Sequence, residues 1–191
     1  MVINALVSFF LLFSGDIMGQ VNEPKFKVIQ NFGSIEIREY DHLLIAQVEV
    51  NGERSVAIRA GFKQLADYIF GNNTLKQKIS MTAPVLQQAS SNDKNKNWHI
   101  SFVMPLEYTM SSLPSPNTNI NIKELTHKQY LVIQFSGFSS DSNLQKHLLK
   151  INQFAQEHGL KTINQPIFAF YNPPWTLPFL RKNEIMLEIK N

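Results

Sequence analysis

The histidines and the absence of cysteine decide which catalytic or metal chemistry this chain can carry. The 191 residues include five histidines and no cysteine, which excludes disulfides, thiolate zinc sites, iron–sulfur clusters, covalent c-type heme and cysteine nucleophiles. His147 and His158 fall on one predicted helix, eleven residues apart. That spacing separates them by about 16 Å, too far for two ligands of one metal ion. We therefore predict no metal site.

The carboxylates give no better case for catalysis. Glu36 and Glu39 fall on the polar side of a predicted hairpin, and Asp67 falls on the outer face of a predicted helix. His99 alternates with apolar neighbours on a predicted strand and should face away from the core. HExxH, P-loop and GxSxG strings do not occur in the sequence. We predict no catalytic residues, and an enzyme is the function class with the least support.

The first predicted helix, from about residue 55 to 71, carries the most informative group of side chains. Its apolar stripe repeats at helical spacing, at Ile58, Phe62, Leu65 and Ile69. Arg59, Ala66 and Phe70 flank that stripe, and Lys63 lies just beyond. Aromatic, small and cationic residues at one edge suit a flat amphipathic ligand with anionic groups. The alternative is an arginine that extends from the helix edge into solvent, as on many surface helices.

The rest of the chain predicts the elements that must position this helix. Period-two alternation predicts strands over residues 25–28, 35–38, 43–50, 79–85, 98–104, 120–122, 131–135, 167–171 and 184–189, and a second helix spans about 142–158. The order strand–strand–helix–strand–strand thus occurs twice. We predict an α+β fold, a distorted antiparallel β-barrel built from these two repeats and flanked by two α-helices. Ile79, Met81, Ala83 and Val85 should point into the barrel.

Composition predicts one folded domain over residues 20–191. Hydrophobic residues make up 43% of the chain and charged residues 17%, which is typical of a globular core. The net charge is +3, and basic residues never form a run of four. Nucleic-acid binding requires a clustered basic patch, so we predict none.

The first 19 residues are read as a signal peptide. The run Ala5–Phe13 is apolar apart from Ser8, and Gly19 supplies a small residue before a cut. The run is too short to span a bilayer, which takes about 20 apolar residues, so the mature chain should not insert stably into a membrane. We expect export to a periplasm or the extracellular space. The alternatives are an uncleaved apolar anchor or an N-terminal strand in a cytoplasmic protein.

Three strings in this chain resemble one known family. Residues 78–85, KISMTAPV, resemble the signature K-[IM]-x-M-T-x-P-V of the SOUL family. Residues 171–184, YNPPWTLPFLRKNE, resemble its closing motif, and Ser136-Gly137-Phe138 resembles the string before its second helix. The resemblance covers about residues 24–190 in consistent order.

The resemblance implies a distorted antiparallel barrel with two helices, and heme or iron-free porphyrin held without covalent attachment in a shallow pocket on the first helix. Arg59 matches a basic position associated with the propionates, and Phe62 and Ala66 match pocket positions. Asp67 stands where some members have a second cation, which should weaken affinity. Lys63 at the helix edge and Trp175 in the closing motif are added to this set. The predicted heme site therefore consists of Arg59, Phe62, Lys63, Ala66 and Trp175.

The resemblance leaves the iron without an assigned protein ligand. Some members have a histidine just before the tyrosine of the first hairpin, and here that position is Glu39, before Tyr40. His42 lies three residues further on, so strand alternation puts it on another face. Heme would then be held by packing alone.

The leading function is a heme or tetrapyrrole binding protein that buffers, carries or scavenges its ligand. Two alternatives remain open. The repeated architecture also resembles the effector-binding domains of bacterial drug-responsive regulators, so the ligand could be another flat amphipathic molecule. The chain could also be an interaction module with a vestigial pocket. The sequence does not indicate protein partners.

The export prediction can be checked on protein from the native host. Mass spectrometry of the mature chain should show an N-terminus near Gln20, because cleavage is expected after Gly19. A cytosolic protein that retains Met1 would contradict the prediction.

Overall fold

The computed structural model describes residues 22–90 and 97–190. The strands are β1 (Lys27–Asn31), β2 (Ile35–Asn51), β3 (Val85–Ala89), β4 (Asn97–Val103), β5 (Asn121–Phe135), β6 (Thr162–Phe170) and β7 (Asn183–Ile189). The helices are α1 (Arg54–Ile69), α2 (Asp141–Glu157) and the short 3₁₀ turn η1 (Pro178–Leu180). The signal peptide predicted over residues 1–19 lies outside the described residues.

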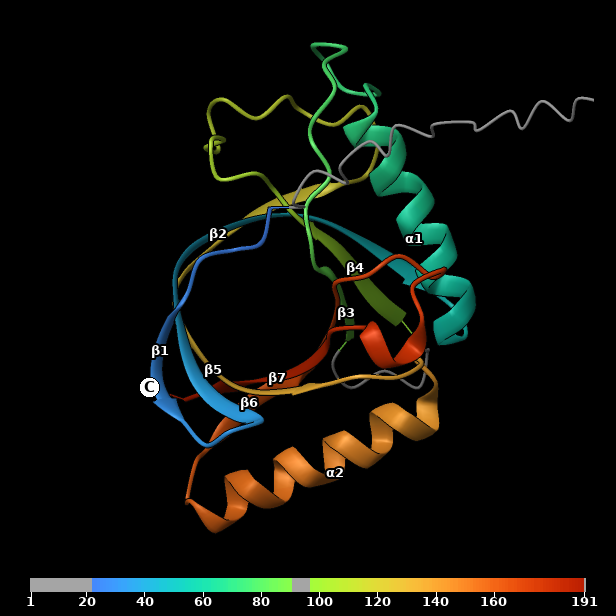
Figure 1. Cartoon of the computed structure of the whole chain (residues 1–191). Helices are drawn as coiled ribbons and strands as arrows, with labels where there is room; N and C mark the ends of the chain where they lie inside the picture. The colour runs from blue at the N-terminus through green and yellow to red at the C-terminus, as the bar shows by residue number, and fades with distance from the viewer. Residues whose placement is uncertain (1–21, 91–96, 191) are drawn as a thin grey trace, which may run out of the picture.

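Six of the strands close into an antiparallel barrel, as Figure 1 shows. Their order is β2-β4-β3-β6-β7-β5, and β5 pairs back onto β2 to complete the ring. β1 lies outside the ring as the partner of β2. The two helices cover the outer surface, α1 against β2 and β4 and α2 against β5 and β7. The predicted fold class is confirmed.

The 17-residue strand β2 supports both helices. Near its start, Ile35 and Ile37 pack in the core beneath α2. Further along, Leu44, Ala46 and Val48 pack in the core beneath α1. A regular strand keeps residues of one parity on one face, so the change from odd to even numbers shows that the alternation reverses between Ile37 and Leu44.

Both helices bury one face, but on α1 it is not quite the face that spacing predicts. α1 buries Ala57, Gly61, Leu65, Tyr68 and Ile69, so its buried face is turned away from Phe62 toward Gly61. α2 buries Leu144, Ile151 and Ala155, and the Ser140 hydroxyl caps it by accepting from the Asn143 backbone N–H. Among the described residues there is no helix long and apolar enough to cross a bilayer.

The predicted strand over residues 79–85 is wrong. β3 begins only at Val85, after Pro84, whose nitrogen carries no hydrogen for a ladder bond. Met81 is 39% exposed, while Ile79 packs in the core beneath α1, on the outside of the barrel. The predicted inward orientation of this segment is therefore also wrong, because the Ile79 side chain packs against α1 on the outside of the barrel.

The second half of the chain departs from the predicted repeat at its start. The predicted strands over 120–122 and 131–135 are parts of one 15-residue strand, β5. The predicted strands over 35–38 and 43–50 are likewise parts of β2. These two long strands pair from Ile35 opposite Ile133 to Gln47 opposite Asn121.

The close packing of α1 on the barrel can be tested at Gly61. A Cβ added there would lie 2.6 Å from Cγ1 and 2.8 Å from Cβ of Ile100. Gly61→Ala should therefore lower the free energy of unfolding by about 1–3 kcal/mol, as overpacking does, although alanine normally favours a helix over glycine. Urea unfolding measures the change. Gln64→Ala, on the exposed side of α1, should stay within about 0.5 kcal/mol of the wild type, and a stabilised Gly61→Ala protein would contradict the packing described.

Candidate functional site

The predicted helix residues lie on the outer, solvent-facing part of α1. Phe62 is 39% exposed, and its ring packs edge-on against Phe102 of β4 with centroids 5.2 Å apart. Arg59 and Lys63 are exposed, and Ala66 is half-buried. All four are close together because they lie within two turns of one helix. Phe70, one further turn along and 65% exposed, extends the apolar surface.

Trp175 comes from a different element, the loop between β6 and β7. It is 79% exposed. The loop is held in shape by Arg181, whose guanidinium donates to the carbonyls of Thr176, at 2.8 Å, and Pro174. Phe170, just before the loop, lies 5.7 Å from the guanidinium of Arg54, the first residue of α1. The structure thus brings the base of this loop to the N-terminal end of α1.

His42, to which no iron-ligand role was assigned, pairs with a carboxylate. His42 Nε2 lies 2.5 Å from Glu124 Oε1, across the β2–β5 pair. Glu39 accepts a hydrogen bond from Gln129 at 2.9 Å. In the part of the chain that the structure describes, no three His, Asp or Glu side chains are grouped as metal ligands.

Inside the barrel, one end is closed by a buried ionic cluster that the sequence analysis did not identify. Arg38 is 4% exposed and Glu184 is fully buried, with Nη1 and Oε1 3.0 Å apart. Glu36 accepts from Arg38 Nε at 2.7 Å, and Tyr171 donates to Glu184 at 2.6 Å. Burial alone would lower the pKa of Arg38, but the two carboxylates outweigh it and raise that pKa. The cluster is satisfied internally and is structural.

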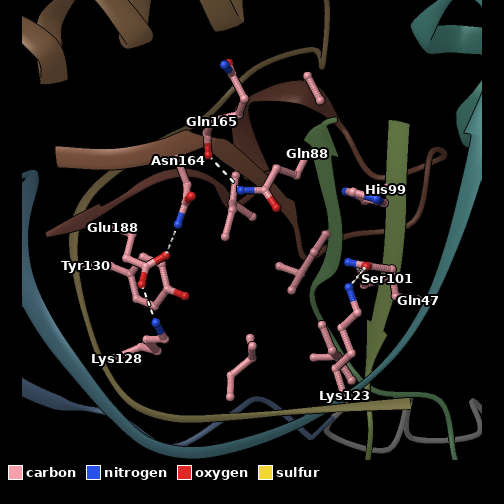
Figure 2. A pocket seen from close by; sticks show the side chains of 15 residues that line it. Gln47, Gln88, His99, Ser101, Lys123, Lys128, Tyr130, Asn164, Gln165 and Glu188 are labelled. Carbon is pink, nitrogen blue, oxygen red and sulfur yellow. Dashed lines mark hydrogen bonds and ion pairs between the residues drawn. The ribbon is translucent and has the colours of Figure 1, made fainter. Parts of the chain in front are cut away.

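The other end of the barrel is an open cavity of about 350 Å³, shown in Figure 2. Side chains from all six barrel strands line it, and most of them are polar. They are Ile45, Gln47, Leu86, Gln88, Ala89, His99, Ser101, Lys123, Leu125, Lys128, Tyr130, Asn164, Gln165, Ile167 and Glu188. A register shift in the β6–β7 pair between Ile163 and Ile167 places Asn164, with φ of +63°, at the rim.

His99 is the most informative residue of this cavity. It faces away from the core beneath α1, as predicted, but it points into the barrel. Burial lowers its pKa below 6.5, and the positive charge of Lys123 lowers it further, against the opposing effect of Glu49. The alternation of polar residues on β2 and β4 was the available signal, but it cannot say which face lies inside a barrel.

Comparison with known proteins identifies the class. Residues 21–188 match the family model of the SOUL heme-binding protein, so the chain belongs to that family, and the predicted resemblance is confirmed. Heme-binding protein 2 of Mus musculus and of Homo sapiens are each 32% identical over 165 residues, covering 83% of this chain and 80% of the relative. The crystal structure of the EcmrR C-terminal domain matches with a TM-score of 0.61 at 12% identity, covering 82% of this chain and 97% of that one. That second likeness shows the fold alone.

The lowered pKa of His99 predicts a pH-dependent stability. Below pH 6.5 His99 is protonated in the unfolded chain, whereas its lowered pKa keeps it neutral to a lower pH in the folded protein. The free energy of unfolding should therefore fall as the pH drops through about 6.5. Urea unfolding at about pH 7.5 and about pH 5.5 measures this, and His99→Gln should reduce the difference. An NMR titration that places the His99 pKa above 6.5 would contradict the burial described.

Proposed function

We propose that this chain binds heme without covalent attachment on the exposed face of α1. The observation that carries the proposal is a pair of exposed aromatic side chains, Phe62 on α1 and Phe70 at its C-cap, which are 39% and 65% exposed, while the opposite face of the helix is buried. Exposed aromatic side chains grouped in this way are typical of ligand or partner sites. Membership of the SOUL heme-binding protein family supports heme as the ligand.

The side chains around this surface match the chemistry of heme. The porphyrin plane would pack on Phe62 and Phe70, and the small side chain of Ala66 between them would let a flat ring approach the helix. Arg59 and Lys63 would pair with the propionates, Arg59 through its two-pronged guanidinium. Asp67 is exposed on the same helix, and its negative charge should reduce affinity for an anionic ligand.

Trp175 would supply a second aromatic contact from the β6–β7 loop. Its indole is largely exposed, and the loop backbone around it is fixed by Arg181 and two carbonyls. A large exposed aromatic residue on a fixed loop loses little conformational entropy when it packs on a ligand.

The proposed role is that of a carrier, buffer or scavenger. Because His42 pairs with Glu124 and Glu39 with Gln129, we infer that packing and propionate pairing supply the affinity, so iron-free porphyrin should bind as well. The apolar run at residues 5–13 supports export, and a periplasmic or extracellular tetrapyrrole carrier is the function that we propose.

The proposal can be tested by Soret-band titrations of the Arg59→Ala protein. A hydrogen-bonded pair with a charged group contributes about 1–3 kcal/mol, so heme should bind about 5- to 150-fold more weakly. Arg59→Lys should recover part of the loss, and the loss should shrink when the propionates of the porphyrin are esterified. Lys63→Ala should weaken binding, while its matched control Lys146→Ala, an exposed lysine on α2, should not.

Two results of the same titrations would redirect the assignment. His42→Ala should leave the Soret maximum of bound heme nearly unmoved, and a lost or displaced band would move the site away from α1. Binding of neither heme nor iron-free porphyrin would favour a different flat ligand or a pure interaction module.

A further inference from the structure

The open end of the barrel has two polar walls that differ in charge, as Figure 2 shows. On the first wall, Lys128 Nζ lies 2.6 Å from Glu188 Oε1, and Asn164 Nδ2 donates to Glu188 Oε2 at 2.7 Å. The ammonium and the carboxylate neutralise each other, and both carboxylate oxygens have donors. This wall is therefore complete without a ligand.

The second wall carries an ammonium group that has no carboxylate partner among the described residues. Lys123 Nζ donates to the amide oxygen of Gln47 at 2.6 Å, and Gln47 Nε2 donates to Ser101 Oγ at 3.1 Å. Within residues 22–90 and 97–190, Lys123 forms no ion pair, and no acceptor is found for the Ser101 hydroxyl proton. The two ends of the Gln47 amide thus bind the Lys123 ammonium and the Ser101 hydroxyl, and each of these groups has a hydrogen left to donate.

Two adjacent donors match the two oxygens of a carboxylate. The ammonium has N–H bonds left after its contact with Gln47, and the Ser101 hydroxyl accepts from Gln47 and so directs its own proton elsewhere. Hydrogen bonds between charged groups are about twice as strong as neutral ones. An anion at this wall would gain both bonds and pair with the Lys123 charge.

The rest of the lining includes an aliphatic surface, formed by Ile45, Leu86, Ala89, Leu125 and Ile167. Beside it lie the polar side chains of Gln88, His99, Tyr130 and Gln165. A volume of about 350 Å³ is at the lower end of the range for small-molecule sites, about 300–1,000 Å³. The cavity therefore favours a short apolar chain over a large ring system.

We propose that the open end of the barrel binds a small aliphatic monocarboxylate, with its carboxylate on Lys123 and Ser101 and its chain on the aliphatic lining. This site is separate from the one proposed on α1, and it does not depend on heme binding.

His99 should link this binding to pH. Its ring stands on the same wall, where burial and Lys123 keep it neutral near pH 7. The facing anion Glu49 is 3.9 Å away at the exposed rim and also accepts a long hydrogen bond from Ser90. A bound carboxylate would add a second negative charge and raise the His99 pKa, so affinity should increase as the pH falls from about 7.5 to about 6.

The test is an NMR and calorimetric titration of the full chain with hexanoate, hexanamide and hexylammonium. Hexanoate should bind with a dissociation constant on the order of millimolar, given its size, and should move the His99 ring-proton signals. The uncharged amide should bind about tenfold more weakly, as the loss of one charged interaction predicts, and hexylammonium should not bind.

Variants separate the charge of Lys123 from the general charge of the protein. Lys123→Met should weaken hexanoate binding about tenfold, and Lys146→Met, its exposed counterpart on α2, should leave binding unchanged. Soret titrations with heme should be the same for wild type and Lys123→Met.

The assignment is overturned by hexylammonium binding as well as hexanoate, by unchanged His99 signals at saturation, or by a Soret titration that responds to Lys123→Met. If Lys123→Met does not fold, the wild-type comparison of hexanoate with hexylammonium at the His99 signals decides the question alone.

Discussion

The pairing of β2 with β5 is the constraint on which the rest of the structure depends. It joins the two halves of the chain along nearly the whole of both strands and turns an open sheet into a closed barrel. Closure removes the exposed edges that β-sheets otherwise have to protect. It also fixes an inside and an outside, and the two helices then cover much of the outer surface with apolar side chains. Two of the apolar cores therefore lie between helix and sheet, beneath α1 and beneath α2, and a third fills part of the barrel interior.

The two ends of the barrel interior consequently accommodate polar side chains in different ways. At the closed end, Arg38 and Glu184 fill the space with a charge pair, at a desolvation cost that such pairs offset only when every polar group is satisfied. Glu36 and Tyr171 provide that satisfaction. The other end is open to solvent, so polar side chains can line its wall at little desolvation cost.

The sequence allowed the fold and the family to be predicted, but not the side of the barrel that each residue faces. Alternation correctly separated His99 from its apolar neighbours, because period two shows which residues share a face. It gave no information on which face the helices cover, so Met81 and Ile79 were assigned inward. Arg38 was missed because a charged residue in a hairpin normally indicates solvent. Its partner Glu184 is 146 residues away in the sequence, and that contact exists only once the barrel has closed. On α1 the wheel placed Phe62 at the centre of the buried stripe, but Gly61 allows the helix to approach Ile100 closely and turns Phe62 to the edge.

The two proposed sites lie on opposite faces of the β2–β4 strand pair. This arrangement indicates whether binding at one site can affect binding at the other. On β4, Phe102 points outward to Phe62, while its neighbour Ser101 points inward to the cavity. The sites are thus separated by the thickness of one sheet, and a ligand on either face contacts side chains one residue apart. The intervening backbone is held by a continuous ladder, from Ile45 opposite Val103 to Asn51 opposite Asn97, and α1 packs tightly on it at Gly61, where an added Cβ would meet Ile100. Communication between sites requires an element with two arrangements whose balance both ligands change. A doubly paired barrel strand is poorly suited to that role, so the structure favours two ligands that bind independently.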